Sequence, residues 1–464
     1  MSRARGGLGP LDGVSLIVGI VVGVSIFKVP ALVFSNVSSP LQGLGVWGLG
    51  GLLALVGALC YAELAVAFPR IGGDYVYLSE AFGRRVGLVF GWASLTATLT
   101  GSIGVMAFVF SDYATDLFGI SRSWSASIAV FAVLSLAVVN LVGLTFGKGA
   151  QNALSLLKLT ALVVLAFAGF TAGDPEGGAA VLRAKAPIDG PGIGLAFILV
   201  MYAYGGWNDA AYVAAEVRDR SRNVPRVLIG GVLLVTLVYL LLNGAYLWAL
   251  GFERLRASAT PATDVLRLTL GASAGHAMSL VVMTSALGAI NGLVLAGPRL
   301  YAAVGADHRA FRSLSRWNER QQVPVAAMLA VAGIAVALIL GIGTNTGRGG
   351  IEFVVATVGL PPVPWESYDG GFGTLVSATA PVFWLFFLLT GLSLFVLRAR
   401  RPDVARPFRV PFYPLPPLVF CGTSLWMLWA SLAYAKGLAL FGLVLLVPGI
   451  LLAIRSPEEA AGKG

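Results

Sequence analysis

Long apolar runs separated by short polar segments recur along the whole chain. Each run is about 20 residues or longer, the length that a helix needs to cross the hydrocarbon core of a bilayer. The runs are too long and too uniformly apolar for the alternating strands of a membrane β-barrel. The pattern predicts twelve membrane-spanning helices, at residues 12–36, 43–68, 86–116, 124–146, 151–173, 192–217, 225–250, 273–306, 324–343, 374–398, 413–434 and 437–455.

Composition supports the same class. Of 464 residues, 57% are hydrophobic and only 12% are charged, with a mean hydropathy of +0.84. A soluble globular chain carries about a quarter charged residues. We therefore expect an all-α membrane protein with about 12 transmembrane helices. It would insert as a single domain over residues 1–464, with no cleavable signal peptide.

The positions of the basic residues predict how the chain lies in the bilayer. Most of the 32 Lys and Arg residues fall in segments on the same side as the N-terminus. The positive-inside rule then predicts that both termini are cytoplasmic and that the protein is a multi-pass protein of the cytoplasmic (cell) membrane. The same rule accounts for the net charge of +10, so nucleic-acid binding is not expected.

The sequence offers little for covalent or metal chemistry. Cys60 and Cys421 lie in or beside apolar spans and indicate neither a disulfide framework nor a metal site. No nucleotide-binding G-x-x-x-x-G-K-[ST] motif and no catalytic constellation occurs, so we expect no cofactor and no enzyme activity. The extracellular segment 341–371 is rich in glycine and proline and is expected to be an irregular loop.

Two apolar spans carry features that should interrupt a helix. The first span reads "VGIVVGVSIFKVP" from Val18 to Pro30, and the sixth reads "MYAYGGWNDA" with Gly205 and Gly206 adjacent. Glycine also serves close helix packing in membranes, so either feature alone is weak. Spans one and six, however, are the first members of two five-span halves. Matched breaks there are typical of an inverted-repeat transporter with its site near the bilayer midplane.

Several motifs resemble those of a known family. They are "GALCYAELAVAFPRIGGDYVYLSEAFG" at 57–83, "AYGGWN" at 203–208, "NVPR" at 223–226, "INGLVLAGPRLY" at 290–301 and "RPFRVPFYPLPPL" at 406–418. The chain resembles the amino acid, polyamine and organocation (APC) transporter family, and within it the L-type amino acid transporter branch. The resemblance implies a LeuT-type 5+5 inverted repeat, with one half at 12–173, the other at 192–398, and two extra helices at 413–455.

The resemblance also implies a site at the two breaks. The substrate carboxylate would bind the amides of Val24, Ser25 and Ile26, where helix dipole and free N–H groups favour an anion. The amine would face carbonyls of Val21, Tyr202 and Tyr204. Ser25 stands where the family usually has glycine, which restricts the backbone and adds a hydroxyl. The candidate substrate-binding residues are Val21, Gly23, Val24, Ser25, Ile26, Tyr202, Tyr204, Gly205 and Asn208.

Two lysines fall inside predicted spans. Lys158 of span five is the candidate coupling residue, because an uncompensated charge in a span is costly and usually functional. The alternative is that it reaches back to the membrane surface. By resemblance, an ammonium here takes the place of a sodium ion, either for proton coupling or as a fixed cation. Lys28 could tune the charge of the site, or pair with an acid such as Asp112.

The sixth span adds the remaining candidates. Tyr202 matches an aromatic gate of the family, and Trp207 belongs to the same motif; both are predicted to gate the site. Asp209 could favour a cationic substrate or stabilise the inner half of the span.

Acidic residues near the inner ends of the spans have a different expected role. Glu63, Asp74 and Glu216 lie near many arginines, and we expect them to form ion pairs at the inner gate or surface.

Together these features predict a sodium-independent secondary transporter of amino acids that works by alternating access. Transport would be proton-coupled symport or amino acid exchange, with neutral substrates preferred. The partners would be the amino acid, the lipid bilayer and, for symport, protons; the sequence does not reveal whether a partner subunit exists. A polyamine or organic-cation transporter and a non-transporting amino acid sensor are the alternatives.

Overall fold

A computed structural model describes residues 8–172, 183–188, 192–357, 359, 362–363, 365 and 370–456. The described part of the chain is almost entirely helical, and it contains two isolated β-bridges but no β-strand. Nine of its helices are long and apolar enough to cross a membrane, and a bent pair of shorter helices makes a tenth. The all-α membrane fold predicted from the sequence is confirmed.

Long helices alternate with shorter ones along the chain. In chain order the α-helices are α1 (Pro10–Val21), α2 (Ser25–Ser35), α3 (Pro40–Ala67), α4 (Asp74–Phe82), α5 (Arg84–Ala93), α6 (Leu99–Phe118), α7 (Ser125–Val142), α8 (Leu144–Ala172), α10 (Ile193–Ala203), α11 (Arg220–Ala257), α12 (Pro261–Leu270), α13 (Ala274–Ala296), α14 (Pro298–Asp307), α15 (Val325–Gly343), α16 (Asn345–Thr357), α17 (Gly370–Arg400), α18 (Leu415–Val444) and α19 (Val447–Arg455).

Some predicted spans differ in detail from these helices. Span six is divided into the 11-residue α10 and a 3₁₀-helix, η3, over Trp207–Glu216, so neither piece alone is long enough to cross a bilayer. The last predicted span, 437–455, is divided between the end of α18 and the short α19. Within the predicted loop 341–371, Asn345–Thr357 is helical (α16), and part of the remainder lies outside the described residues.

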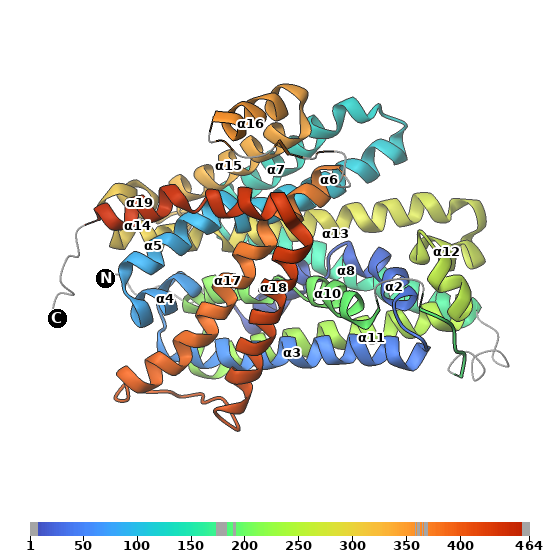
Figure 1. Cartoon of the computed structure of the whole chain (residues 1–464), viewed down its shortest axis with the longest axis horizontal. Coiled ribbons are helices and arrows are strands. Elements are labelled where there is room, and N and C mark those ends of the chain that lie inside the picture. The colour runs from blue at the N-terminus through green and yellow to red at the C-terminus, as the bar shows by residue number, and fades with distance from the viewer. Residues whose placement is uncertain are drawn as a thin grey trace.

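The broken helices lie inside a cage of continuous ones. Figure 1 shows α3, α11 and α13 running lengthwise, with α17 and α18 crossing them. Helix α1 packs against α8, α11 and α13, while α2 and α10 pack against each other. The interrupted segments are therefore surrounded by protein, which is the condition under which irregular backbone is tolerated at membrane depth.

The first break separates α1 from α2. The two helices are bent by 53°. The Val22 amide donates the last bond of α1 to the Val18 carbonyl (3.1 Å), and the Gly23 amide then turns back to the Val21 carbonyl (2.7 Å). Helix α2 restarts at Ser25, so the chain leaves the helical path for three residues.

The second break is built around Gly206. This residue has a φ of +101°, which L side chains rarely adopt, and a Cβ placed on it would lie 2.8 Å from Cγ2 of Ile20 in α1. Glycine is therefore required twice, once by the backbone conformation and once by the approach of the neighbouring helix. The contact also means that the two breaks touch each other.

Ion pairs join helices at the end of the molecule where α3 finishes. Glu63 is completely buried and pairs with Arg398 and Arg406, and buried Arg299 donates to Glu216 across 2.9 Å between Nε and Oε1. The predicted ion pairing is thus confirmed for Glu63 and for Glu216, each of which has an arginine partner. Asp74 differs: it is buried and accepts from the Tyr61 and Thr390 hydroxyls, and it forms no ion pair with any described residue.

We expect Gly206→Ala to lower stability by about 1–2 kcal/mol or more, because alanine would be strained at positive φ and would displace Ile20. Thermal unfolding in detergent measures this. The matched control is Gly230→Ala in α11, where a Cβ meets no atom within 4 Å and should be neutral or slightly stabilising. Equal melting temperatures for Gly206→Ala and the wild type would contradict the assignment.

We expect Arg299→Met to destabilise the protein by about 3–5 kcal/mol, since it leaves the Glu216 carboxylate buried without its partner. Adding Glu216→Gln should restore much of the loss, because the uncompensated charge is then gone. A double-mutant cycle on melting temperature measures the coupling. Additive effects of the two substitutions would show that the pair is not coupled.

Candidate functional site

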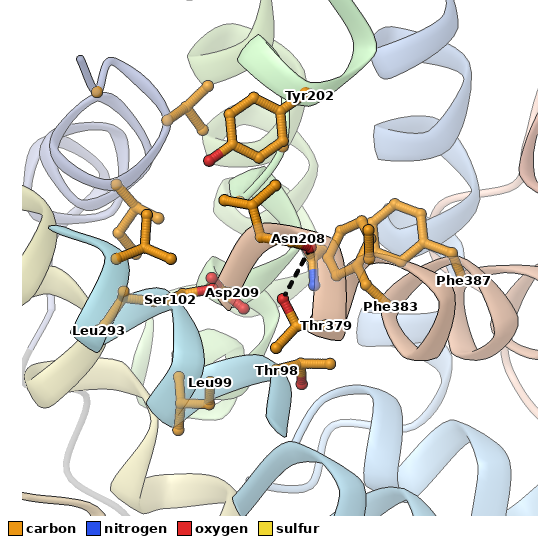
Figure 2. A pocket seen from close by; sticks show the side chains of 18 of the residues that line it. Thr98, Leu99, Ser102, Tyr202, Asn208, Asp209, Leu293, Thr379, Phe383 and Phe387 are labelled. Atoms are coloured by element: carbon orange, nitrogen blue, oxygen red, sulfur yellow. Dashed lines mark hydrogen bonds between the residues drawn. The ribbon is translucent and has the colours of Figure 1, made fainter. Parts of the chain in front are cut away.

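A cavity of about 170 Å³ lies where the two breaks meet. Its lining residues come from α1, α2, α10 and η3 at the two breaks and from α4, α5, α6, α13 and α17 around them. Figure 2 shows Tyr202 at one side of this space, with Asn208, Asp209 and Thr379 below it. Of the predicted binding residues, those that line the cavity are Val21, Gly23, Ser25, Tyr202, Gly205 and Asn208.

The start of α2 offers free donors. Within the described chain, the amides of Val24, Ser25 and Ile26 donate to no protein acceptor, and the first bond of the helix runs from the Phe27 amide to the Val24 carbonyl (3.0 Å). Such amides at a helix N-terminus attract an anion. Ser25 lines the cavity, whereas the side chains of Val24 and Ile26 are buried away from it.

The carbonyls at the first break are held by side chains from the surrounding helices. Lys158 Nζ lies 2.8 Å from the Gly19 oxygen, and Ser285 Oγ lies 2.9 Å from the Val22 oxygen. The Tyr246 hydroxyl donates to the Ile26 oxygen (3.3 Å). These donors come from α8, α13 and α11, and they offset the several kcal/mol that unpaired carbonyls would cost in an apolar interior.

Tyr239 of α11 connects the two breaks. Its hydroxyl oxygen lies 3.0 Å from the Val21 oxygen at the end of α1 and 3.0 Å from the Ala203 oxygen at the end of α10. One hydroxyl carries one proton, so the two carbonyls share a single donor. Sequence reasoning missed this residue; the available signal was a tyrosine within an apolar span, whose hydroxyl needs a partner.

Lys158 is buried within the protein, with no exposed surface. The alternative that it reaches the membrane surface is wrong. Its Nζ lies beside the Gly19 carbonyl, and a Cβ added to Gly288 of α13 would come within 3.4 Å of it. The ammonium is thus enclosed by α1, α8 and α13, behind the cavity wall.

The aromatic candidates of span six separate into two groups. Tyr202 lines the cavity (Figure 2). Trp207 instead packs in an aromatic cluster, with its ring centroid 5.0 Å from that of Tyr61 and 5.7 Å from that of Phe387. Tyr204 turns toward α3, where its hydroxyl lies 3.2 Å from the Trp47 oxygen. Only Tyr202 of these three therefore has its side chain on this cavity.

The charged candidates are separated in the same way. Lys28 is exposed on α2 and does not line the cavity, so the structure does not bring it to the site. Asp209 does line it, and so does Asp74, which sequence reasoning assigned to an ion pair.

The rest of the cavity lining was not predicted. It includes Thr98 and Ser102 near the start of α6 and Thr379 and Phe383 of α17 (Figure 2). Thr98 ends η1 (Ser94–Thr98), a turn of π-helix between α5 and α6. Such turns often occur at functional sites because they re-aim side chains. Nothing in the local sequence identifies the π-turn in advance.

Comparison with known proteins identifies the family. A sequence model described as "Amino acid permease" matches residues 8–454. The chain is 29% identical over 433 residues to the mouse "b(0,+)-type amino acid transporter 1", covering 92% of this chain and 82% of that protein. It is 27% identical to the "Serine/threonine exchanger SteT" of Bacillus subtilis, covering 92% and 91%.

A further relative is the mouse "Large neutral amino acids transporter small subunit 2", which is 29% identical over 91% of this chain and 76% of that protein. The resemblance inferred from the motifs is confirmed over nearly the whole chain. The LeuT-type membrane fold expected of the APC family agrees with the helical architecture. The chain therefore belongs to the amino acid permease family and is an amino acid transporter of the APC type.

Proposed function

We propose that this protein is a sodium-independent transporter of neutral amino acids in the cell membrane, with both termini in the cytoplasm. It would work by alternating access, coupled to protons or to exchange of a second amino acid. The observation that carries the proposal is the meeting of two helix breaks at one cavity. At the start of α2 this cavity has backbone amides that donate to no acceptor in the described chain. An amino acid zwitterion needs N–H donors for its carboxylate and carbonyl acceptors for its amine, and the two helix breaks supply both.

The substrate carboxylate would accept hydrogen bonds from the amides of Val24, Ser25 and Ile26. The amine would donate to carbonyls at the ends of α1 and α10. The Val21 oxygen accepts from the Gly23 amide, and it shares the single Tyr239 proton with the Ala203 oxygen. When that proton is directed at Val21, both lone pairs of the Val21 oxygen are occupied. Binding of an amine there therefore requires Tyr239 to give up its bond to Val21 and keep the one to Ala203. Substrate binding at the end of α1 would thus change the hydrogen bond of Tyr239 to the end of α10.

The side chain of the substrate would lie against the largely apolar wall. Leu293, Phe383 and Leu99 line the cavity and suit a neutral aliphatic or aromatic group (Figure 2). Tyr202 is placed to close over the bound molecule. We retain Tyr202 as the proposed gate, while the packing of Trp207 favours a supporting role behind it.

Lys158 supports sodium independence. Its ammonium already donates to a carbonyl at the end of α1, where a metal cation would otherwise be attractive. The group can act either as a fixed cation that holds α1, α8 and α13 together or as a group that releases a proton during the cycle. These two roles distinguish exchange from symport.

Opening of the cavity requires α1 and η3 to move relative to their neighbours. Arg299 and Glu216 link α14 to the end of η3, and Glu63 links α3 to Arg398 of α17. In the alternating-access cycle these pairs would separate when their end of the molecule opens. Substrate can shift that equilibrium only by binding the two states with different affinity.

Uptake into liposomes tests the substrate class and the coupling. In liposomes containing the purified protein, we expect saturable uptake of radiolabelled neutral amino acids without a sodium gradient. Uptake driven by a proton gradient would indicate symport, and uptake that needs internal amino acid would indicate exchange. A strict sodium requirement would contradict the sodium independence, and absence of uptake for a full amino acid panel would favour the polyamine alternative.

Replacement of Lys158 tests the role of its ammonium group. We expect Lys158→Met to reduce uptake by roughly tenfold or more, because a hydrogen bond from a charged donor to the Gly19 carbonyl is lost. Lys148→Met is the matched control in the same helix, since Lys148 is partly exposed and lies 3.5 Å from Asp12. If proton-driven uptake disappears while exchange persists, Lys158 is the coupling group. Full activity of Lys158→Met would exclude both roles.

A further inference from the structure

Two carboxyl groups share the cavity without a counter-charge. Asp74 is the first residue of α4 and Asp209 is the third residue of η3, and both line the cavity at the two breaks. The two groups are near enough to repel each other when both are ionised. None of the described residues that line the cavity is basic, and neither acid forms an ion pair within the described chain. Two negative charges here would be uncompensated, which is costly in a protein interior.

Four tyrosines face the pair from different elements. They are Tyr61 of α3, Tyr77 of α4, Tyr212 of η3 and Tyr301 of α14. A tyrosine is neutral near pH 7, so it can donate a hydrogen bond to a carboxylate but cannot balance its charge. Arginines of the neighbouring elements pair with other acids, namely Arg299 with Glu216, Arg398 with Glu63, and both Arg70 and Arg84 with Asp307.

Two buried oxygen atoms beside the pair lack a hydrogen-bond partner. Asp74 Oδ1 accepts from the Tyr61 and Thr390 hydroxyls, whereas Asp74 Oδ2 has no partner. Asn208 lies beside Asp74, and its buried Oδ1 has no partner either. Most buried acceptors in proteins are paired, so a donor is missing here. A proton on Asp74 Oδ2 would convert that oxygen to a donor with Asn208 Oδ1 as its acceptor, so one bound proton accounts for both unpaired oxygens.

Asp74 also lies between the cavity and a closed end of the molecule. Tyr75, the next residue, donates from its hydroxyl to Asp307 (3.0 Å), and Asp307 pairs with the exposed Arg70 (2.8 Å). When these contacts separate, Asp74 would meet water from that end. The affinity of the site for a proton would then differ between the closed and the open state, which is the condition for coupling proton binding to the conformational change.

We propose that Asp74 and Asp209 form a proton-binding site, which holds one proton while this end is closed and releases it to water when the end opens. This inference rests on the proposed function, and it assigns the coupling proton to the pair and leaves Lys158 as a fixed cation. Burial and a neighbouring negative charge both favour the protonated form, whereas water that enters on opening favours ionisation. The two carboxyls titrate together, so the proton belongs to the pair. The described residues include no group of three or more His, Cys, Asp and Glu that could hold a metal ion, which favours a proton here.

Proton movement during uptake tests the proposal. In liposomes with a pH-sensitive dye inside, we expect a labelled neutral amino acid to enter together with protons. The double variant Asp74→Asn with Asp209→Asn keeps the shape of both side chains but removes both carboxyls. We expect its uptake under an inward proton gradient to fall by roughly tenfold or more, while exchange of labelled for unlabelled amino acid at equal pH persists. Each single substitution should move the pH of half-maximal uptake to lower values, because the remaining carboxyl loses its negative neighbour.

The controls separate the possible failures. Asp116→Asn, which changes an exposed acid paired with Arg122, should behave as the wild type. The double variant should melt at or above the wild-type temperature, since uncompensated charge is removed. Wild-type transport of amino acids without proton movement would overturn the proposal, even if the double variant does not fold. Proton movement that persists in the folded double variant would overturn it too, as would sodium-driven uptake that this variant loses. If the wild type neither takes up nor exchanges any amino acid, the proposed function itself fails.

Discussion

The structure depends on one constraint, which is that backbone polar groups have no water to bond with inside a bilayer. Each group freed from a helix must find a partner in the protein or in a ligand. At the first break, the carbonyls of Gly19, Val22 and Ile26 are held by side chains from three other helices. The continuous helices α8, α11 and α13 therefore stabilise the break directly, because each one contributes a hydrogen-bond donor to it. The break is stable only because those helices are present around it.

At the first break, several carbonyls accept hydrogen bonds from side chains, whereas three amides have no acceptor in the described chain. Side chains of Lys158, Ser285 and Tyr246 donate to the carbonyls of Gly19, Val22 and Ile26, whereas the Val21 carbonyl shares one side-chain donor, Tyr239, with Ala203. The amides of Val24, Ser25 and Ile26 receive no acceptor from the described chain and remain directed by the dipole of α2. Amides without acceptors at a helix N-terminus favour an anion, which supports the carboxylate site that we propose there. Tyr239 connects the first break to the second, because the Val21 and Ala203 oxygens share its single hydroxyl proton.

Acidic groups divide between structure and site in a similar way. Glu63 and Glu216 each have an arginine partner and hold helices together. Asp74 and Asp209 form no ion pair with any residue that the structure describes, and both line the cavity. Inside a membrane protein an acid without a basic partner is retained at a substantial cost, so its presence on a cavity wall favours a functional role.

The sequence by itself determined the membrane class, the helical spans and the position of both breaks, because these follow from local properties: the length of an apolar run and the freedom of glycines such as Gly205 and Gly206. The family motifs added Tyr202, Asn208 and the amides near Ser25. Only the tertiary structure decided which side chains face the cavity. Because η3 is a 3₁₀-helix, its residues follow a spacing of three per turn, and Trp207 turns into the Tyr61 cluster while Asp209 faces the cavity. Lys158, Tyr239 and Asp74 acquire their partners from segments distant in the chain, and that rotation and register between helices cannot be read from any single span.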